Sequence, residues 1–206
     1  MYIAIEGIKG TGKSTIIREL SGKNSDLAVF PITGRMSKFH PLELQHAFNP
    51  GLKTDDTFLE HLFKERAYWN QDKVIGASPL ILGDRSVVTS YVTRWNKWHD
   101  PNYTIRKVNR EYWGIMKPDV IVWIDSPVNL ASSNIKSRQQ KDLGKQDECL
   151  DRLLTARHIY EELFSQKLLL KKCFRSQIVK VDGRCHTSEL LDEVLGIIEY
   201  YRKTGV

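Results

Sequence analysis

The sequence predicts an α/β fold in which a parallel sheet lies between two layers of helices. Five short β-prone runs, apolar on both faces, alternate with longer segments of helical periodicity, which is typical of a parallel sheet covered on each side. A glycine-rich loop joins the first of these runs to the first helical segment. With 206 residues, 41% of them hydrophobic, the chain is large enough to bury one sizeable core. We therefore expect three layers, a five-stranded parallel sheet and a single domain spanning residues 1–206.

The expected elements alternate along the chain. The five strands are expected at residues 2–5, 27–30, 80–83, 120–124 and 177–181. Apolar residues recur at helical spacing elsewhere and predict helices from Ser14, at about 56–75, 86–97 and 104–116, from Pro127, from Leu150 to Leu168, and around 190–198. Pro127 fits the first position of its helix, where a missing N–H does no harm.

Charged residues follow three of the predicted strands directly. The third strand runs into Asp84 and Arg85, the fourth into Asp125, and the fifth into Asp182. Ligands of such sheets bind outside the carboxyl ends of the strands. We therefore expect Asp84, Arg85 and Asp125 to lie along the same edge as the glycine-rich loop.

The glycine-rich loop carries the most specific signal in the chain. Residues 7–15 read Gly-Ile-Lys-Gly-Thr-Gly-Lys-Ser-Thr and contain the complete phosphate-binding pattern G-x-x-x-x-G-K-[ST] in its required strand–loop–helix context. The glycines permit positive φ and bring backbone N–H groups close to a phosphate chain, and the helix N-terminus adds partial positive charge. The loop is therefore expected to bind ATP through Gly7, Gly10, Thr11, Gly12, Lys13, Ser14 and Thr15.

Side chains at this edge are suited to phosphoryl transfer with Mg²⁺. Lys13 is expected to reach the β- and γ-phosphates, and Ser14 Oγ to bind the metal ion. Asp84 can hold Mg²⁺ or its waters, or orient an acceptor oxygen. Arg85 can bridge the donor and acceptor phosphates and neutralise the charge that moves between them. A structural ion pair at the strand end is the alternative for Asp84 and Arg85.

Four features together resemble the thymidylate kinases, a nucleoside-monophosphate-kinase branch of P-loop proteins. They are Ile5-Glu6-Gly7, the glycine loop, Asp84-Arg85-Ser86, and a basic segment before a Tyr-containing helix. The resemblance implies a P-loop NTPase fold and transfer of the γ-phosphoryl group of ATP to dTMP. Deoxynucleoside kinases are a related group with an acid-Arg-Ser sequence at a comparable point, so Asp84-Arg85-Ser86 does not exclude them.

The resemblance also implies residues that bind the acceptor. Arg85 is expected to contact the acceptor's phosphate. Arg35 lies soon after the second strand, where the family has a phosphate-binding Arg; a solvated loop residue is the alternative. Phe63 and Arg66 are similar to a base-stacking Phe and a base-contacting Arg that the family places four residues apart. Here they are three apart, which still shares a helix face, and core packing is the alternative for Phe63.

A basic segment falls where these kinases have a mobile lid, at about residues 136–148. Cations on such a flap can close over the ATP phosphates and expel water. Arg138 is the expected catalytic cation because its planar guanidinium matches phosphate oxygens. A solvated surface is the alternative.

Three positions depart from the family. Lys9 stands where thymidylate kinases usually have an Asp that meets the acceptor sugar, so the usual contact to the 3′-hydroxyl cannot form in that way. Lys9 can instead face solvent or assist the ATP phosphates. Arg94, near the family's Tyr-Gln pair, can donate to a base or a phosphate, or face solvent. The stretch Trp95–Asp100 has no counterpart that we can assign.

We therefore predict an ATP-dependent nucleoside monophosphate kinase, acting on dTMP or a related deoxynucleotide. A deoxynucleoside kinase is one alternative, and Glu6 or Asp84 would then be the base for a hydroxyl acceptor. A P-loop NTPase switch linked to nucleic acid is another, suggested by the net charge of +6 and the residues 95–98.

Composition indicates where in the cell the protein works and what it binds. No apolar run approaches the ~20 residues of a membrane span, and the chain opens directly on a strand, so we expect neither a membrane anchor nor a secretory signal. Three cysteines without metal-like spacing suit a reducing cytoplasm. A positive charge attracts nucleotides as well as nucleic acid. We expect a cytoplasmic protein with a small-molecule nucleotide substrate, and the resemblance suggests a homodimer.

Overall fold

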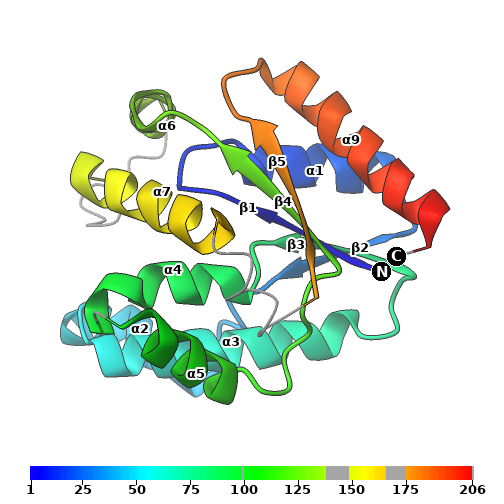
Figure 1. Ribbon diagram of the computed structural model, residues 1–206. Helices are drawn as coiled ribbons and strands as arrows, with labels where there is room; N and C mark the ends of the chain where they lie inside the picture. Colours follow the sequence, from blue (N-terminus) through cyan, green and yellow to red (C-terminus); the bar gives the residue numbers. More distant parts are fainter. Residues whose placement is uncertain (99, 138–148, 166–174, 206) are drawn as a thin grey trace.

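Five parallel strands form one sheet in the order β2-β3-β1-β4-β5 in the computed structural model, which describes residues 1–98, 100–137, 149–165 and 175–205 (Figure 1). The strands are β1 (Tyr2–Glu6), β2 (Leu27–Pro31), β3 (Leu80–Asp84), β4 (Val120–Asp125) and β5 (Gln177–Asp182). The described helices are α1 (Lys13–Lys23), α2 (Pro41–Phe48), the 3₁₀ helix η1 (Pro50–Lys53), α3 (Asp56–Val74), α4 (Val87–Trp98), α5 (Pro101–Glu111), α6 (Val128–Lys136), α7 (Leu150–Ser165) and α9 (Thr187–Thr204).

Two buried clusters, one on each face, hold the helices to the sheet. Alternate side chains of a strand point to opposite faces, so Ile3 and Ile5 of β1 join the cluster that α1 and α9 cover. Tyr2 and Ala4 join the cluster formed with α3, α4, α5 and α7. Figure 1 shows α1 and α9 on one side of the sheet and α3, α4 and α5 on the other. The predicted α/β fold with a five-stranded parallel sheet is confirmed.

The structure corrects several local expectations. Burial on both faces holds for β1 and β4, whereas the edge strands β2 and β5 are largely half-buried or exposed, because each has only one neighbour. Pro127 is the N-cap of α6 and not its first residue. The helix expected at 104–116 is α5, which begins three residues earlier, where Asp100 accepts a hydrogen bond from the Asn102 N–H.

The helix α2 was not expected from the sequence. It has eight residues, and Glu43 is its only buried residue, so it has no apolar stripe of the kind that identifies an amphipathic helix. His40 accepts from the N–H of Leu42, and Pro41 follows at the first helical position. The predicted helix end at Leu168 lies outside the described residues. None of the described helices has the length and apolar character needed to cross a membrane.

Candidate active site

The glycine loop adopts the conformation that its composition predicts. Gly7, Gly10 and Gly12 have φ angles of 144°, 90° and 86°, which L-residues rarely adopt. A Cβ on Gly7 would lie 2.6 Å from the carbonyl oxygen of Ile124, so β4 approaches the loop too closely for any side chain there. The Asn134 amide of α6 donates to the Gly10 carbonyl at 2.9 Å. The loop is thus fixed against the carboxyl end of β4 and the helix that follows it.

Lys13 lies within this loop and is buried. Its ammonium group donates to the carbonyl of Ile8 at 2.5 Å and to Thr11 Oγ1 at 3.0 Å. These bonds hold a positive charge against the loop whose backbone N–H groups, together with the start of α1, favour an anion. The loop therefore has the arrangement of charge that a phosphate chain requires.

The two predicted metal ligands lie next to each other. Ser14 Oγ, exposed on the first turn of α1, is 3.4 Å from Asp84 Oδ2 at the end of β3. They are 70 residues apart in the chain, but β1, which leads into the loop, lies beside β3 in the sheet, and this brings the loop and Asp84 to one edge. A hydroxyl and a carboxylate oxygen are ligands that Mg²⁺ prefers, so these donors fit the metal ion expected from the sequence.

Arg85 is held in an unusual backbone conformation beside the loop. Its φ of +71° is the only positive value at a non-glycine residue in the described part of the chain. Its backbone N–H donates to the Ile5 carbonyl at 3.2 Å, and its Nη1 donates to the Gly7 carbonyl and to Thr89 Oγ1, both at 3.3 Å. The guanidinium group therefore lies against the first glycine of the phosphate loop.

Glu6, considered above as a base for a hydroxyl acceptor, is fully buried. Its carboxylate accepts hydrogen bonds from Ser86, Thr89 and Tyr160. Asp84 is only half-buried. Of the two carboxylates proposed as a base, Asp84 is therefore the one that an acceptor can reach.

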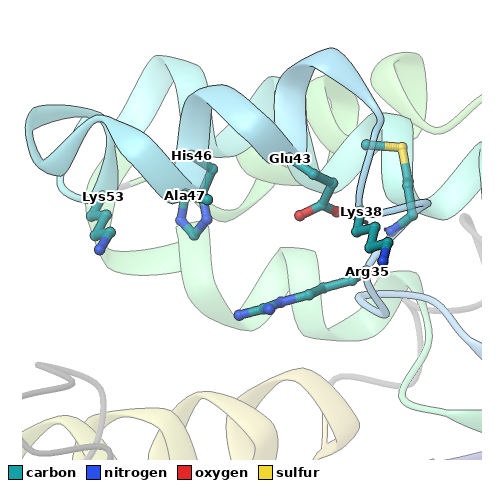
Figure 2. A pocket seen from close by; sticks show the side chains of 7 residues that line it. Arg35, Lys38, Glu43, His46, Ala47 and Lys53 are labelled. Atoms are coloured by element: carbon teal, nitrogen blue, oxygen red, sulfur yellow. Dashed lines mark hydrogen bonds between the residues drawn. The ribbon is translucent and has the colours of Figure 1, made fainter.

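A cavity of about 350 Å³ lies beside α2 and the segment that leads into it. Figure 2 shows Arg35 extending beneath α2, while His46 and Lys53 point toward the same space. The first lining residue, Arg35, lies four residues beyond Pro31, the last residue of β2, which is paired with Asp84 in the sheet. Its lining residues, mostly polar and predominantly basic, are Arg35, Met36, Lys38, Glu43, His46, Ala47 and Lys53.

Arg66 lies behind the cavity and holds one of its lining residues, Glu43. Its Nε and Nη2 donate to the two carboxylate oxygens of Glu43, each at 2.7 Å, and its guanidinium lies 5.4 Å from the centre of the Phe63 ring. Burial raises the pKa of Glu43, but the hydrogen bonds from Arg66 and from the Met36 N–H outweigh it, so the pKa lies below its usual value. Burial, with Arg66 nearby, lowers the pKa of His46. Arg66 is thus committed to an ion pair, and any contact with a base stays a prediction.

The remaining predicted residues do not all lie at the loop, and some fall outside the described residues. Arg94 pairs with Glu111 and approaches Glu60 at 4.0 Å, in a cluster between α3, α4 and α5. Lys9 is half-buried in the loop. Trp95 is buried and its Nε1 donates to Glu162 of α7 at 3.1 Å, so this part of the unassigned aromatic stretch packs inside the protein. Arg138 and most of the lid segment lie outside the described residues.

Two positively charged side chains that were not predicted from the sequence contact Asp125 at the end of β4. Arg157 of α7 donates from Nε and Nη2 at 2.8 and 3.1 Å, and Lys180 Nζ lies 2.7 Å from the carboxylate. Burial raises the pKa of Asp125, but these hydrogen bonds outweigh it and hold the pKa below its usual value. Asp125 and Arg157 are 32 residues apart in the chain, and Lys180 is farther still, so no local sequence pattern reveals these pairs.

Comparisons with known proteins agree with this geometry. No family model matches the chain, but a thymidylate kinase from Acinetobacter baylyi is 26% identical over 179 residues, 82% of this chain and 88% of the relative. A thymidylate kinase from Acinetobacter baumannii strain AYE is 25% identical over 174 residues, 80% and 86% of the two chains. The chain is therefore similar in sequence to thymidylate kinases over about four fifths of its length.

Solved structures share the fold of this chain. Deoxyadenosine kinase from M. mycoides with bound dCMP and a flexible dCDP has a TM-score of 0.64 and 18% identity, covering 97% of this chain and 99% of that chain. The same enzyme with bound dATP has a TM-score of 0.63 and 20% identity, covering 97% and 100%. At this identity the likeness concerns the fold alone.

Proposed function

We propose that this kinase transfers the γ-phosphoryl group of ATP, with Mg²⁺, to the phosphate of a deoxynucleoside monophosphate such as dTMP. The observation that carries the proposal is the meeting of three features at one sheet edge. These are the glycine loop with Lys13, the Ser14–Asp84 pair, and the Arg85 guanidinium against Gly7. A basic cavity is lined by residues from Arg35 onward, four residues beyond the end of β2, the strand that pairs with β3. The sequence likeness to thymidylate kinases supports the choice of acceptor class.

The residues of the loop would bind and orient the donor. Backbone N–H groups of the loop and the start of α1 favour the phosphate chain, and Lys13 supplies a cation at its β- and γ-phosphates. Ser14 and Asp84 would hold Mg²⁺, which neutralises charge between the phosphates when bound. Little covalent chemistry is needed because phosphoryl transfer depends mainly on positioning and charge.

The acceptor would lie between the loop and the cavity. Arg85, anchored on the loop, can contact the acceptor phosphate and the transferring group at once. Arg35 and the other cations of the cavity would attract the anionic acceptor, and Phe63 and Arg66 would contribute to the wall that surrounds its base. Arg94 and Arg138 as ligands, with the lid at 136–148, remain proposals based on the resemblance, as do a cytoplasmic location and a homodimer.

A deoxynucleoside kinase is the second candidate, favoured by the fold shared with the deoxyadenosine kinase over 97% of this chain. Its acceptor is a hydroxyl that needs a base, and the burial of Glu6 leaves Asp84 for this role. Such an enzyme would use Arg85 only for the transferring phosphoryl group. The two candidates therefore differ in what Arg85 does for substrate binding.

An acceptor screen separates these activities. ATP and Mg²⁺ are offered with each nucleoside and each nucleoside monophosphate, and ADP formation is measured. We expect turnover with a deoxynucleoside monophosphate, and Arg85→Ala should raise its KM and lower kcat. Turnover with nucleosides alone would favour the second candidate, and slow hydrolysis that no acceptor accelerates would indicate a switch. Either result would overturn the proposal.

A further inference from the structure

A single buried carboxylate connects four segments of the active site. Glu6, the last residue of β1, accepts from both the backbone N–H and Oγ of Ser86 at 2.7 Å. It also accepts from Thr89 Oγ1 of α4 at 3.0 Å and from the Tyr160 hydroxyl of α7 at 2.8 Å. Glu6 is 0% exposed and precedes the first glycine of the loop directly. An anion removed from water in this way is costly unless its oxygens are satisfied, and here four donors satisfy them.

The donors around Glu6 are themselves fixed in their roles. Burial, and then the negative charge of Glu6, raise the pKa of the Tyr160 hydroxyl far above its usual value. Tyr160 therefore keeps its proton and remains a donor throughout the working pH range. Ser86 is 1% exposed, and its Oγ also accepts from the Val88 N–H at 3.2 Å, which ties the network to the first turn of α4.

The network leads from Glu6 to the Arg85 side chain through one hydroxyl. Thr89 Oγ1 donates to Glu6 and accepts from Arg85 Nη1 at 3.3 Å. The same Nη1 donates to the Gly7 carbonyl. Glu6 therefore lies one hydroxyl group away from the guanidinium that contacts the phosphate loop.

The network also holds the backbone of Arg85. The φ of +71° at this residue costs of order 1 kcal/mol and persists only where neighbouring contacts over-determine it. Glu6 binds the N–H of Ser86, the next peptide along, and the Tyr2 hydroxyl donates to the Arg85 carbonyl at 3.3 Å. Both contacts fall on the peptide that follows Arg85, while the N–H of Arg85 itself donates to the Ile5 carbonyl. The strained residue is thus held on both sides of its backbone and at its side chain.

We propose that Glu6 is a positioning residue that acts through Ser86 and Thr89 to hold the Arg85 guanidinium on the phosphate loop. This inference rests on the proposed function, because Arg85 is the group that would touch the acceptor phosphate and the transferring phosphoryl group. Glu6 itself touches neither. Its effect on turnover must therefore pass through Arg85, which distinguishes it from a residue that only stabilises the core.

A double-mutant cycle tests this dependence. Glu6→Gln, Arg85→Ala and the double variant are compared with the wild type by kcat and KM for ATP and for the monophosphate acceptor. We expect Glu6→Gln to lower the acceptor kcat/KM about 10-fold, within the range of measured couplings, with the KM for ATP within about 2-fold. In the Arg85→Ala background the same change should alter kcat/KM less than about 2-fold, because the guanidinium it positions is gone.

Thr89→Val is tested in a second double-mutant cycle with Arg85→Ala, and this cycle decides the question if Glu6→Gln fails to fold. The substitution removes only the hydroxyl between Glu6 and Arg85. Thr93→Val is its matched control: Thr93 is exposed one turn later on α4 and donates to the Ser90 carbonyl, so its kinetics should not change. If Arg85→Ala lowers kcat/KM and the change at Glu6 or Thr89 lowers it by the same further factor in that background as in the wild type, the positioning role is overturned. The proposed contact of Arg85 with the acceptor phosphate would still stand. An Arg85→Ala enzyme with unchanged kinetics would overturn both this role and the proposed contact with the acceptor phosphate.

Discussion

The glycine loop and the cavity beside α2 are built in opposite ways. The loop consists of consecutive residues, 7–15, and presents mainly its backbone, at φ angles that glycine permits. The cavity is lined by side chains from the segment 35–40, α2 and η1, and its ion pair reaches across to α3. One region is therefore defined by local sequence and the other by contacts between distant parts of the chain.

This difference separates chemistry from specificity. A backbone site changes only if its glycines change, and β4 leaves no room for a Cβ at Gly7. A cavity lined by side chains can change its shape and charge by substitution while the sheet stays the same. We therefore expect variants of the loop to abolish turnover with every acceptor, and variants of the cavity to alter stability or acceptor choice.

Replacing Lys13 should have the largest effect on turnover. Lys13→Ala removes the cation at the β- and γ-phosphates, and losing one principal charge stabiliser lowers kcat by ~10²–10³-fold. The measurement is kcat with each acceptor, and the loss should be the same for all of them. Lys23→Ala, an exposed lysine at the end of the same helix, is the control and should behave as wild type. Near-normal turnover of a folded Lys13→Ala enzyme would contradict the role of the loop.

Breaking the buried ion pair of the cavity should mainly affect stability. Glu43→Ala leaves the Arg66 guanidinium buried, with side chains 7% and 8% exposed in the pair, and losing one partner of such a pair costs about 3 kcal/mol. Urea denaturation measures this loss. Glu19→Ala is the control, because its pair with Arg18 is exposed and should contribute less than about 1 kcal/mol. The KM for the acceptor should rise while the KM for ATP stays constant, and a rise in both would contradict the separation of the two regions.

The same difference explains what the sequence could predict. The strands and the loop depend on neighbours in the chain, and both were found, including the glycines with positive φ. The helix α2, which carries Glu43, was missed because its buried face is polar and bonds to Arg66, 23 residues away. The expectation that Arg66 faces a base came from its spacing to Phe63. That spacing indicates which residues share a helix face, but it does not reveal the partner on another helix, here Glu43 of α2.

Glu6 illustrates a second limit. Its position before the loop made it a candidate base, but the donors that enclose it come from Ser86, Thr89 and Tyr160, up to 154 residues away. Burial is a property of the assembled core, so a carboxylate in a strand can be identified from sequence while its access to solvent cannot.

Removing the charge of Asp125, which pairs with Arg157 and Lys180 at the end of β4, should lower the free energy of unfolding by a smaller amount that depends on pH. Asp125→Asn weakens the bonds from Arg157 and Lys180, and bonds to charged groups contribute about 2 kcal/mol each, reduced here because both cations are partly exposed. The folded-state pKa of Asp125 is lowered, so its contribution is complete above the unfolded pKa, about 4. It is lost as the pH falls through the folded value.

The free energy of unfolding, measured between pH 7 and pH 2 for both proteins, checks this sign. The difference between wild type and Asp125→Asn should be constant at neutral pH and shrink below about pH 4. Asp192→Asn, at an exposed position of α9, provides the reference for a carboxylate on the surface. A difference that grows as the pH falls would contradict the role of the carboxylate charge.

Lys9 joins the two regions, because it belongs to the loop in sequence but is expected near the acceptor sugar. A lysine only donates hydrogen bonds, whereas a carboxylate only accepts them, so dTMP should be a poor substrate or be held by other contacts to its sugar. Lys9→Asp should then raise kcat/KM for dTMP relative to other acceptors by about 2- to 10-fold, the effect of one hydrogen bond. Lys23→Asp makes the same change of charge on α1 and should leave the ratio as it is. If Lys9 instead assists the ATP phosphates, Lys9→Asp will lower kcat/KM for all acceptors in parallel, and an unchanged ratio will mean that this position does not set acceptor choice.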